Sequence, residues 1–343
     1  MEIREAIECL LESQPLAEDE AEAVMEQIMA GQATPAQIGG FLIALRLKGE
    51  TVEEITGFAS AMRRKAISVR PQPCLMVDTC GTGGDGVGTF NISTTAAFVV
   101  AGAGLVVAKH GNRSVSSRCG SADMLEALGV NLNLTPDQIA ACIDAVGIGF
   151  LYAPLLHPAM KHAIGPRREM GVRTVFNVLG PLTNPAGAQA QVLGVYDPSL
   201  TETLANVLHS LGCRDAFVVH GADGLDELST TGPNQVAELH DGVVRAFTLD
   251  ALELSIPRAT IDDLRGGNAQ ENAQIVQEVL GGAHGPRRDV VLLNSAAGLV
   301  AGGLADSLAS GLQMAAGSID SGRALDKLTA LVTLTQTMEP IPA

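Results

Sequence analysis

The strongest chemical signal in the sequence is a short basic segment, residues 109–123, in an otherwise acidic chain. It reads KHGNRSVSSRCGSAD and holds three permanent cations, one histidine, four serines and two glycines within 15 residues. Cations attract anions, and serine hydroxyls and glycine-flanked backbone amides donate hydrogen bonds to phosphate oxygens. A solvated basic loop is seldom so rich in glycine and serine. The segment therefore predicts a binding site for a phosphorylated small molecule.

Two upstream segments have the composition of phosphate-binding turns. Residues 78–86 (DTCGTGGDG) carry three glycines within four residues directly after an apolar run, which lets backbone amides approach an anion closely. Residues 89–95 (TFNISTT) place hydroxyls and an amide where a helix is predicted to begin, and the N-terminus of a helix favours phosphate. Each segment alone also fits an ordinary strand-to-helix turn or N-cap. Neither is a Walker loop or a dinucleotide-binding G-x-G-x-x-G in the right register.

The elements that must position these segments are predicted from apolar patterning. Short apolar runs that end in polar or glycine residues predict strands, and amphipathic stretches between them, including 135–146 and 199–211, predict helices. The strand candidates are 75–78, 105–108, 192–195, 216–219 and 290–293. Alternating strands and helices predict an α/β fold with a mostly parallel central sheet, in which ligands bind beyond the carboxyl ends of the strands.

The N-terminal part of the chain predicts helices only. Thr34 and Thr51 each open a capping box ahead of an apolar stretch, and the Pro- and Arg-containing residues 70–73 predict a linker. We expect a small all-helical domain over residues 1–70, completed by helices near 160–185. The remainder, residues 71–343, is expected to form the large α/β domain.

Composition narrows the classes of function and location. The formal net charge of −16 argues against nucleic-acid and membrane partners, since phosphate backbones and anionic lipids repel an acidic surface. The six cysteines are dispersed without a C-x-x-C pair, and the N-terminus lacks an apolar signal core. These features predict a protein of the cytoplasm.

Taken together, the segments resemble the anthranilate phosphoribosyltransferase family, which shares a fold group with pyrimidine nucleoside phosphorylases. The matching motifs stand in order along nearly the whole chain: GTGGD at 81–85, NIST at 91–94, KHGNRSVSS at 109–117, HPAM at 157–160, RREMGVRTVFNVLGPLTNP at 167–185 and HGADGLDE at 220–227. The resemblance implies a pentosyl-transferring glycosyltransferase of tryptophan biosynthesis. Such an enzyme joins the phosphoribosyl group of 5-phosphoribosyl 1-pyrophosphate to anthranilate and releases pyrophosphate.

The resemblance also implies roles for individual residues. Those expected to contact phosphoribosyl pyrophosphate are Gly81, Gly84, Asp85, Thr89, Asn91, Ser93, Thr94, Lys109, Asn112, Ser117 and Ser121, with Gly111, Arg113 and Ser116 completing the cradle. Those expected at the anthranilate site are Arg167 as the carboxylate partner, together with Gly81, Asn112, Gly180, His110 and His157. The expected ligands of a magnesium cofactor are Ser93, Asp226 and Glu227. Asp78 and Arg173 are expected to be structural.

The chemistry so implied needs positioning more than proton transfer. Positive charge develops on the ribose and negative charge on the leaving pyrophosphate, so preorganised cations and amides supply most of the catalysis. An aromatic amine is largely neutral at pH 7 and attacks directly, so no general base is assigned. The family likeness further implies a homodimer formed through the helical domain, which hinges against the α/β domain to close the site.

Two alternatives remain open from the sequence. A pyrimidine nucleoside phosphorylase-like enzyme would require a KHSTGG loop and a longer C-terminal domain, whereas this chain reads KHGNR at 109–113 and ends at residue 343. A nucleic-acid-binding, non-catalytic relative would have basic surfaces and decayed loops, whereas this chain is acidic and its loops are complete.

Overall fold

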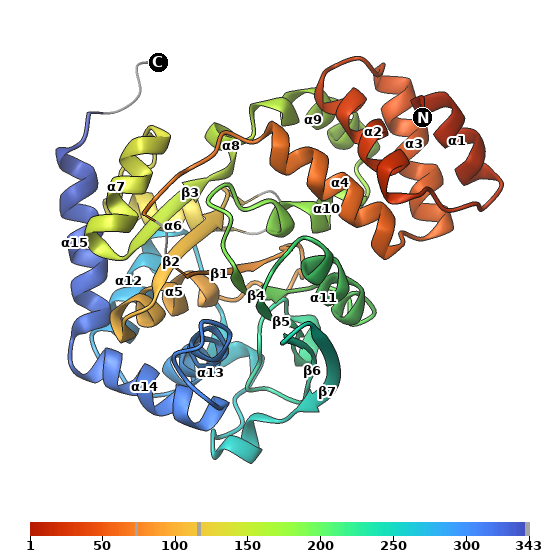
Figure 1. Cartoon of the computed structure of the whole chain (residues 1–343). Coiled ribbons are helices and arrows are strands. Elements are labelled where there is room, and N and C mark those ends of the chain that lie inside the picture. The colour runs from red at the N-terminus through yellow and green to blue at the C-terminus, as the bar shows by residue number, and fades with distance from the viewer. Residues whose placement is uncertain (73–74, 115–117, 340–343) are drawn as a thin grey trace.

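The computed structural model of the chain describes residues 1–72, 75–114 and 118–339. A helical bundle lies beside a larger layered body, in which helices cover both faces of a sheet (Figure 1). The bundle contains α1 (Ile3–Leu11), α2 (Glu18–Met29), α3 (Pro35–Lys48) and α4 (Val52–Lys65). Both of these capping boxes are confirmed. The side chains of Thr34 and Thr51 accept from the backbone N–H at the third helical position, and their own backbone N–H groups donate to the Gln37 and Glu54 side chains.

The sheet has seven strands in the order β3-β2-β1-β4-β5-β6-β7. The strands are β1 (Met76–Gly81), β2 (Val106–Gly111), β3 (Ile148–Tyr152), β4 (Ala190–Gly194), β5 (Asp215–His220), β6 (Asn234–His240) and β7 (Val243–Leu249). The first five pair in parallel, and β6 and β7 add an antiparallel edge, so the expected mostly parallel sheet is confirmed. Successive strands lie to either side of β1, so the strand order reverses there. Such a reversal opens a crevice at the carboxyl ends of the strands.

One strand prediction was wrong, and three strands were not predicted. Residues 290–293 belong to α13 (Pro286–Ala301), which is buried along most of its length. A short apolar run does not distinguish a buried strand from a segment of buried helix. The missed β6–β7 hairpin turns at Asp241 and Gly242, both with positive φ. An Asp-Gly pair of this kind is a hairpin signal that the sequence contained.

The remaining helices cover the sheet and connect it to the bundle. They are α5 (Ile92–Ala103), α6 (Ser121–Ala127), α7 (Pro136–Val146), α8 (Ala153–Leu156), α9 (Lys161–Met170), α10 (Phe176–Leu179), α11 (Leu200–Ser210), α12 (Ala269–Leu280), α14 (Leu308–Asp320) and α15 (Arg323–Thr337), with short 3-10 helices η1 (Pro158–Met160), η2 (Gly180–Thr183), η3 (Ala222–Gly224), η4 (Ala251–Leu254) and η5 (Ile261–Leu264). Helix α5 is buried on nearly every side, so the residues at its N-terminus are held firmly. No helix within the described ranges is long and apolar enough to cross a membrane.

The bundle and the sheet share one continuous apolar core. Phe41 and Phe58 of the bundle belong to the same buried cluster as Phe176 of α10 and Leu204 of α11. At the end of α4, Arg63 donates from Nε to the Leu182 carbonyl at 2.7 Å and from Nη1 to the Leu211 carbonyl at 3.0 Å. The C-terminus of α4 is therefore tied to the α/β body.

Candidate functional site

The carboxyl ends of the central strands bring the predicted phosphate-binding segments together. Gly83 of the glycine-rich loop donates its backbone N–H to Asp226 Oδ2 at 2.6 Å. Ser93, in the first turn of α5, donates its backbone N–H to Glu227 Oε1 at 3.1 Å. The acidic pair that follows β5 thus lies against both the loop after β1 and the N-terminus of α5, more than 130 residues earlier in the chain.

Glycines at two strand ends make this close approach possible. A Cβ on Gly81, at the end of β1, would collide with the Asp226 carboxylate. A Cβ on Gly194, at the end of β4, would collide with the Asp226 backbone. Both positions have ordinary backbone angles, so these glycines are required for space and not for an unusual conformation.

The acidic pair is electrostatically strained in the absence of a counter-charge. Burial, followed by the charge of Asp85, raises the pKa of Asp226 to about 6. Burial, followed by the charge of Asp226, raises the pKa of Glu227 to about 8, and Lys109 acts in the opposite direction. Neighbouring carboxylates that resist ionisation in this way favour a bound cation.

Behind this pair, a buried polar network fixes the ends of β1 and β2. Asp78 is fully buried, and its carboxylate accepts hydrogen bonds from His110 N at 3.1 Å and from Asn184 Nδ2 at 2.7 Å. Lys109 is also buried and donates from Nζ to the Thr79 carbonyl. Because its carboxylate holds the strands in place, Asp78 has the structural role expected from the sequence.

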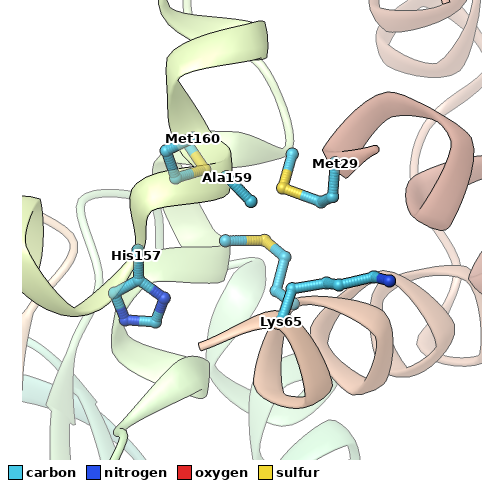
Figure 2. A pocket seen from close by; sticks show the side chains of 6 residues that line it. Met29, Lys65, His157, Ala159 and Met160 are labelled. Carbon is cyan, nitrogen blue, oxygen red and sulfur yellow. The ribbon is translucent and has the colours of Figure 1, made fainter. Parts of the chain in front are cut away.

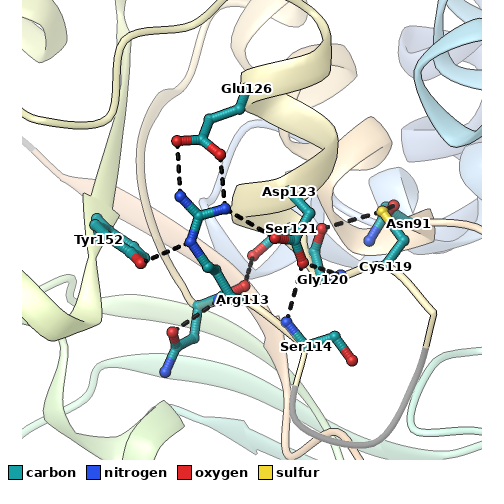
Figure 3. A network of polar contacts seen from close by, with 10 residues as sticks. Asn91, Arg113, Ser114, Cys119, Gly120, Ser121, Asp123, Glu126 and Tyr152 are labelled. Carbon is teal, nitrogen blue, oxygen red and sulfur yellow. Dashed lines mark hydrogen bonds and ion pairs between the residues drawn. The ribbon is translucent and has the colours of Figure 1, made fainter. Parts of the chain in front are cut away.

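The loop after β2 is held by carboxylates on α6 (Figure 3). Arg113 pairs with both oxygens of Glu126, at 2.6 and 2.7 Å, with Asp123 at 2.9 Å and with the Tyr152 hydroxyl at 3.0 Å. Asp123 Oδ2 also accepts from Ser114 N and Gly120 N, so one carboxylate joins both ends of the loop. The guanidinium of Arg113 therefore faces α6, and its charge is balanced within the protein.

The sequence predicted that Arg113 contacts the donor, but it did not predict that Glu126 and Asp123 bind Arg113. Glu126 lies outside the recognised motifs and carries no compositional signal. Asp123 closes the basic segment three residues after Gly120, which is the spacing of a helix-capping acid. The predicted contacts Ser116 and Ser117 fall outside the described residues.

Other members of the predicted donor set have definite positions. Ser121 Oγ donates to the Asn112 carbonyl at 3.2 Å, and a Cβ on Gly111 would collide with that hydroxyl. Asn91 is the N-cap residue of α5, and the Thr94 side chain is buried in its first turn. Thr89 bridges to Arg265 in an antiparallel pair.

The outer side of the glycine-rich loop is held by Arg173. Its guanidinium donates to the Gly84 carbonyl and stacks 4.2 Å from the centre of the Tyr196 ring. The Asp85 carboxylate accepts from Val87 N at 3.3 Å and interacts with Asp226. Arg173 therefore shapes the loop, in keeping with its expected structural role.

A second group of predicted residues lies toward the bundle. The rings of His110 and His157 are buried, and their centres are 5.1 Å apart. Burial lowers the pKa of His110 to about 3 and that of His157 to about 4. His110 also bonds to the backbone of Gly180. The Nε2 atoms of both rings are buried without a hydrogen-bond partner among the residues that the structure describes. Two such orphaned atoms mark a place where a ligand can supply the missing hydrogen bonds.

His157 also borders a small pocket at the contact between the bundle and η1 (Figure 2). The pocket is too tight to admit a water molecule and is lined by Met29, Met62, Lys65, His157, Ala159 and Met160. Nearby on α9, the Arg167 guanidinium lies 5.1 Å from the centre of the Phe176 ring, and burial lowers its pKa. A half-buried cation beside an aromatic ring suits an aromatic carboxylate.

Protein groups alone do not complete a metal site. In residues 1–72, 75–114 and 118–339, no cluster of three or more His, Cys, Asp or Glu side chains is arranged to hold a metal ion. The Asp226–Glu227 pair instead offers two adjacent carboxylates next to Ser93. A magnesium ion commonly uses such a pair and fills its shell with water and substrate phosphates.

Comparison with known proteins agrees with this arrangement. Residues 4–66 match the glycosyl transferase family helical bundle domain, and residues 74–325 match the glycosyl transferase family a/b domain. Anthranilate phosphoribosyltransferase of Moorella thermoacetica is 60% identical over 330 residues, covering 96% of this chain and 97% of the relative. The enzyme of that name from Pelotomaculum thermopropionicum is 60% identical over 333 residues, covering 97% and 96%.

Solved structures give the same answer. Anthranilate phosphoribosyltransferase from Thermus thermophilus superposes with a TM-score of 0.92 at 44% identity, covering 96% of this chain and 99% of that one. The enzyme from Saccharomyces cerevisiae, in complex with PRPP and Mg, superposes with a TM-score of 0.89 at 28% identity, covering 98% of each chain. With two family models and full-length relatives in agreement, the chain belongs to the anthranilate phosphoribosyltransferase family.

Proposed function

We propose that this protein transfers the phosphoribosyl group of 5-phosphoribosyl 1-pyrophosphate to the amino group of anthranilate, giving N-(5-phosphoribosyl)anthranilate and pyrophosphate. The observation that carries the proposal is the pair of contacts from Gly83 and Ser93 to Asp226 and Glu227. These contacts join a glycine-rich loop, a helix N-terminus and an acidic pair at one end of the sheet. A donor that carries a 5′-phosphate, a pyrophosphate and a metal ion needs these three features together.

On the donor side, each segment would bind part of the negative charge of phosphoribosyl pyrophosphate. The loop at 81–85 and the α5 N-terminus (Thr89, Asn91, Ser93, Thr94) offer amides and hydroxyls. The stretch from the end of β2 to the start of α6 (Lys109, Gly111, Asn112, Ser121) offers a cation and further donors, with Arg113 shaping the loop through α6. Preorganised groups of this kind stabilise the charge that develops on the leaving pyrophosphate.

Magnesium fits the donor set at the acidic pair. Asp226 and Glu227, with the Ser93 hydroxyl beside them, would hold the ion, and their raised pKa values are the sign of a missing counter-charge. When bound, the ion neutralises phosphate charge. The relative from Saccharomyces cerevisiae was solved with PRPP and Mg, which supports the same use here.

On the acceptor side, Arg167 would pair with the anthranilate carboxylate while Gly81, Asn112, Gly180, His110 and His157 surround the ring. Both histidines are neutral at pH 7, because their pKa values lie at about 3 and about 4. Such weak bases bind a substrate by hydrogen bonds but take up little proton from it. This supports direct attack by the neutral amine with no general base.

Assembly and setting complete the proposal. We assign residues 1–70, with the helices near 160–185, to the helical domain and residues 71–343 to the α/β domain. The protein would act as a homodimer in the cytoplasm, within tryptophan biosynthesis.

On α3, Ile43 and Leu47 lie one turn apart and are 37% and 81% exposed, which offers an apolar face for a second copy. Leu47→Glu should convert the dimer to a monomer, measured by light scattering, whereas a mass unchanged by the variant would exclude this face.

The direct test is an assay with purified protein, anthranilate, phosphoribosyl pyrophosphate and magnesium. The chain contains no Trp, so anthranilate fluorescence can be followed against a low background. We expect the fluorescence to fall only when all three components are present. No decrease, with donor binding still measurable by calorimetry, would reject anthranilate as the acceptor.

A further inference from the structure

Residues 264–266, which precede α12, pair with residues 88–90, which lead into α5. Phe90 N donates to the Leu264 carbonyl at 3.1 Å, and Gly266 N donates to the Gly88 carbonyl at 3.0 Å. Between these bonds, Thr89 and Arg265 form an antiparallel bridge. Residues 88–90 are thus held by residues 264–266, some 175 positions later, at the point where the chain enters α5.

Asn272 of α12 lies beneath this crossing and reaches Asn91. It is 1% exposed, its Oδ1 accepts from Gly267 N at 2.7 Å, and its Nδ2 donates to Asn91 Oδ1 at 2.9 Å. A Cβ on Gly266 would lie 2.6 Å from Asn272 Oδ1 and 2.7 Å from Phe90 Cα. A glycine at 266 is therefore what allows the two segments and the carboxamide to meet.

A second donor converges on the same oxygen. The Cys119 thiol, at the end of the loop after β2, lies 3.6 Å from Asn91 Oδ1 and 3.4 Å from the Gly120 carbonyl (Figure 3). Asn272 and Cys119 therefore determine which end of the Asn91 carboxamide accepts. Since the oxygen and nitrogen diverge from Cγ, this arrangement turns Asn91 Nδ2 away from Asn272, and no described residue accepts from it.

We propose that Asn272 is a positioning residue that fixes the Asn91 carboxamide with its Nδ2 toward an anionic oxygen of the donor substrate. The proposal rests on the function proposed above, in which Asn91 contacts phosphoribosyl pyrophosphate. A flipped carboxamide would place an oxygen against the anion and exchange attraction for repulsion. Fixing the side chain before binding removes that wrong orientation and its entropy cost.

Asn272→Asp tests this orientation with almost no change in volume. One carboxylate oxygen still accepts from Gly267 N, while the other faces Asn91 Oδ1 in place of the donor. We expect the KM for phosphoribosyl pyrophosphate to rise about tenfold, as for a lost hydrogen bond to a charged group, with the KM for anthranilate changed by less than about twofold. Asn131→Asp is the matched control, since Asn131 likewise accepts one backbone bond and donates one, to Thr335 O, outside the site.

A double-mutant cycle with Asn91→Ala separates positioning from a general structural role. If Asn272 acts through Asn91, Asn272→Asp adds nothing to the donor KM once Asn91 is alanine. A penalty of equal size in both backgrounds would overturn the proposal. Should Asn272→Asp fail to fold, Asn272→Ser enters the same cycle, since its hydroxyl is too short to reach Asn91.

The donor affinity can also be measured by calorimetry without turnover. Wild-type protein that binds phosphoribosyl pyrophosphate but leaves anthranilate unreacted would contradict the proposed function and leave this cycle intact. Wild-type turnover with no coupling between Asn91 and Asn272 would contradict the positioning role alone.

Discussion

Two glutamates, Glu54 buried in the bundle and Glu227 half-buried at the carboxyl ends of the central strands, occupy opposite electrostatic situations. Glu54 of α4 is fully buried, and its carboxylate accepts from Leu16 N at 3.0 Å and Thr51 N at 2.9 Å and pairs with Lys48 Nζ at 2.8 Å. Glu227 accepts from the Ser93 amide, but desolvation, followed by the charge of the neighbouring Asp226, raises its pKa to about 8.

The difference shows how structural and functional charges can be told apart. The bundle compensates its buried charge from its own groups, so the charge serves the fold. At the carboxyl ends of the strands, the protein supplies too little positive charge for two carboxylates and no hydrogen-bond partner among the described residues for two histidine nitrogens. The cost in stability can be recovered when a ligand binds. A ligand is the missing partner in the second case and is not needed in the first.

The largest effect is expected from removing a charge at the uncompensated pair. Asp226→Asn should raise the magnesium concentration needed for half-maximal activity by at least about a hundredfold, because it removes the charge of a proposed ligand and residues that only support such ligands already contribute up to about that much. The measurement is a magnesium titration of initial rates at saturating substrates. Asp223→Asn, the same change at an exposed aspartate of the same turn, should leave the titration unaltered. Equal curves for Asp226→Asn and wild type would remove Asp226 from the metal site.

A smaller effect, confined to the acceptor, is expected at α9. Arg167→Ala should raise the KM for anthranilate about thirtyfold, since it deletes a charged partner of the carboxylate, and should change the donor KM little. Steady-state kinetics with each substrate varied in turn gives both constants. Arg168→Ala, at the exposed neighbouring position, is the control. An unchanged anthranilate KM would show that the carboxylate binds elsewhere.

The pH dependence of metal binding should follow the acidic pair. Magnesium binds the ionised carboxylates, so its apparent affinity should rise about tenfold between pH 6.5 and 8, as the pair with pKa values of about 6 and about 8 loses protons. Calorimetric titration at several pH values measures this, and Glu227→Gln should flatten the curve.

The same pair predicts the stability of the metal-free protein. A carboxyl whose pKa is raised on folding contributes stability below its unfolded pKa, near 4, and loses that contribution as pH rises through its folded pKa. The melting temperature without magnesium should therefore fall between pH 5 and 8.5, and magnesium should restore it most at the higher pH. A melting temperature that rises over this range would contradict the raised pKa values.

The smallest effect on catalysis is expected from the compensated glutamate. Glu54→Gln removes the charge facing Lys48 and should lower the stability of the bundle by about 3 kcal/mol, as for a broken buried ion pair, while each kinetic constant stays within about twofold. Urea unfolding followed by circular dichroism, beside the exposed control Glu53→Gln, measures the loss. A change in donor KM would mean that the two regions are more closely coupled than their contacts indicate.

Short sequence patterns correctly predicted the elements that depend mainly on interactions between neighbouring residues, such as the starts of helices. The capping boxes at Thr34 and Thr51 begin helices where expected, and the helix predicted over 135–146 is present as α7. The apolar run at 290–293 failed because its burial depends on the helices packed around α13, which no short window contains. The strands β6 and β7, which were not predicted, pair with each other through the Asp241–Gly242 turn, and this turn does have a local sequence signal.

The same division holds within the site. Glycine, serine and lysine in motifs 81–121 carry a compositional signal, so that half of the site could be proposed from residue types. The approach of Glu227 to Ser93 spans 134 residues, and only the family resemblance suggested that they meet. Supporting residues such as Asp123 and Asn272 carry ordinary side chains, and their role becomes visible only through the atoms they touch.

The shared core of bundle and sheet has a consequence for synthesis on the ribosome. Helices α1 to α4 emerge first, but the cluster that contains Phe41 and Phe58 also includes Phe176 and Leu179, which are translated more than 110 residues after α4 ends. At about 5–20 residues per second, the apolar surface of the nascent bundle waits on the order of ten seconds for these partners. During that interval the growing chain presents an apolar surface of the kind that molecular chaperones bind.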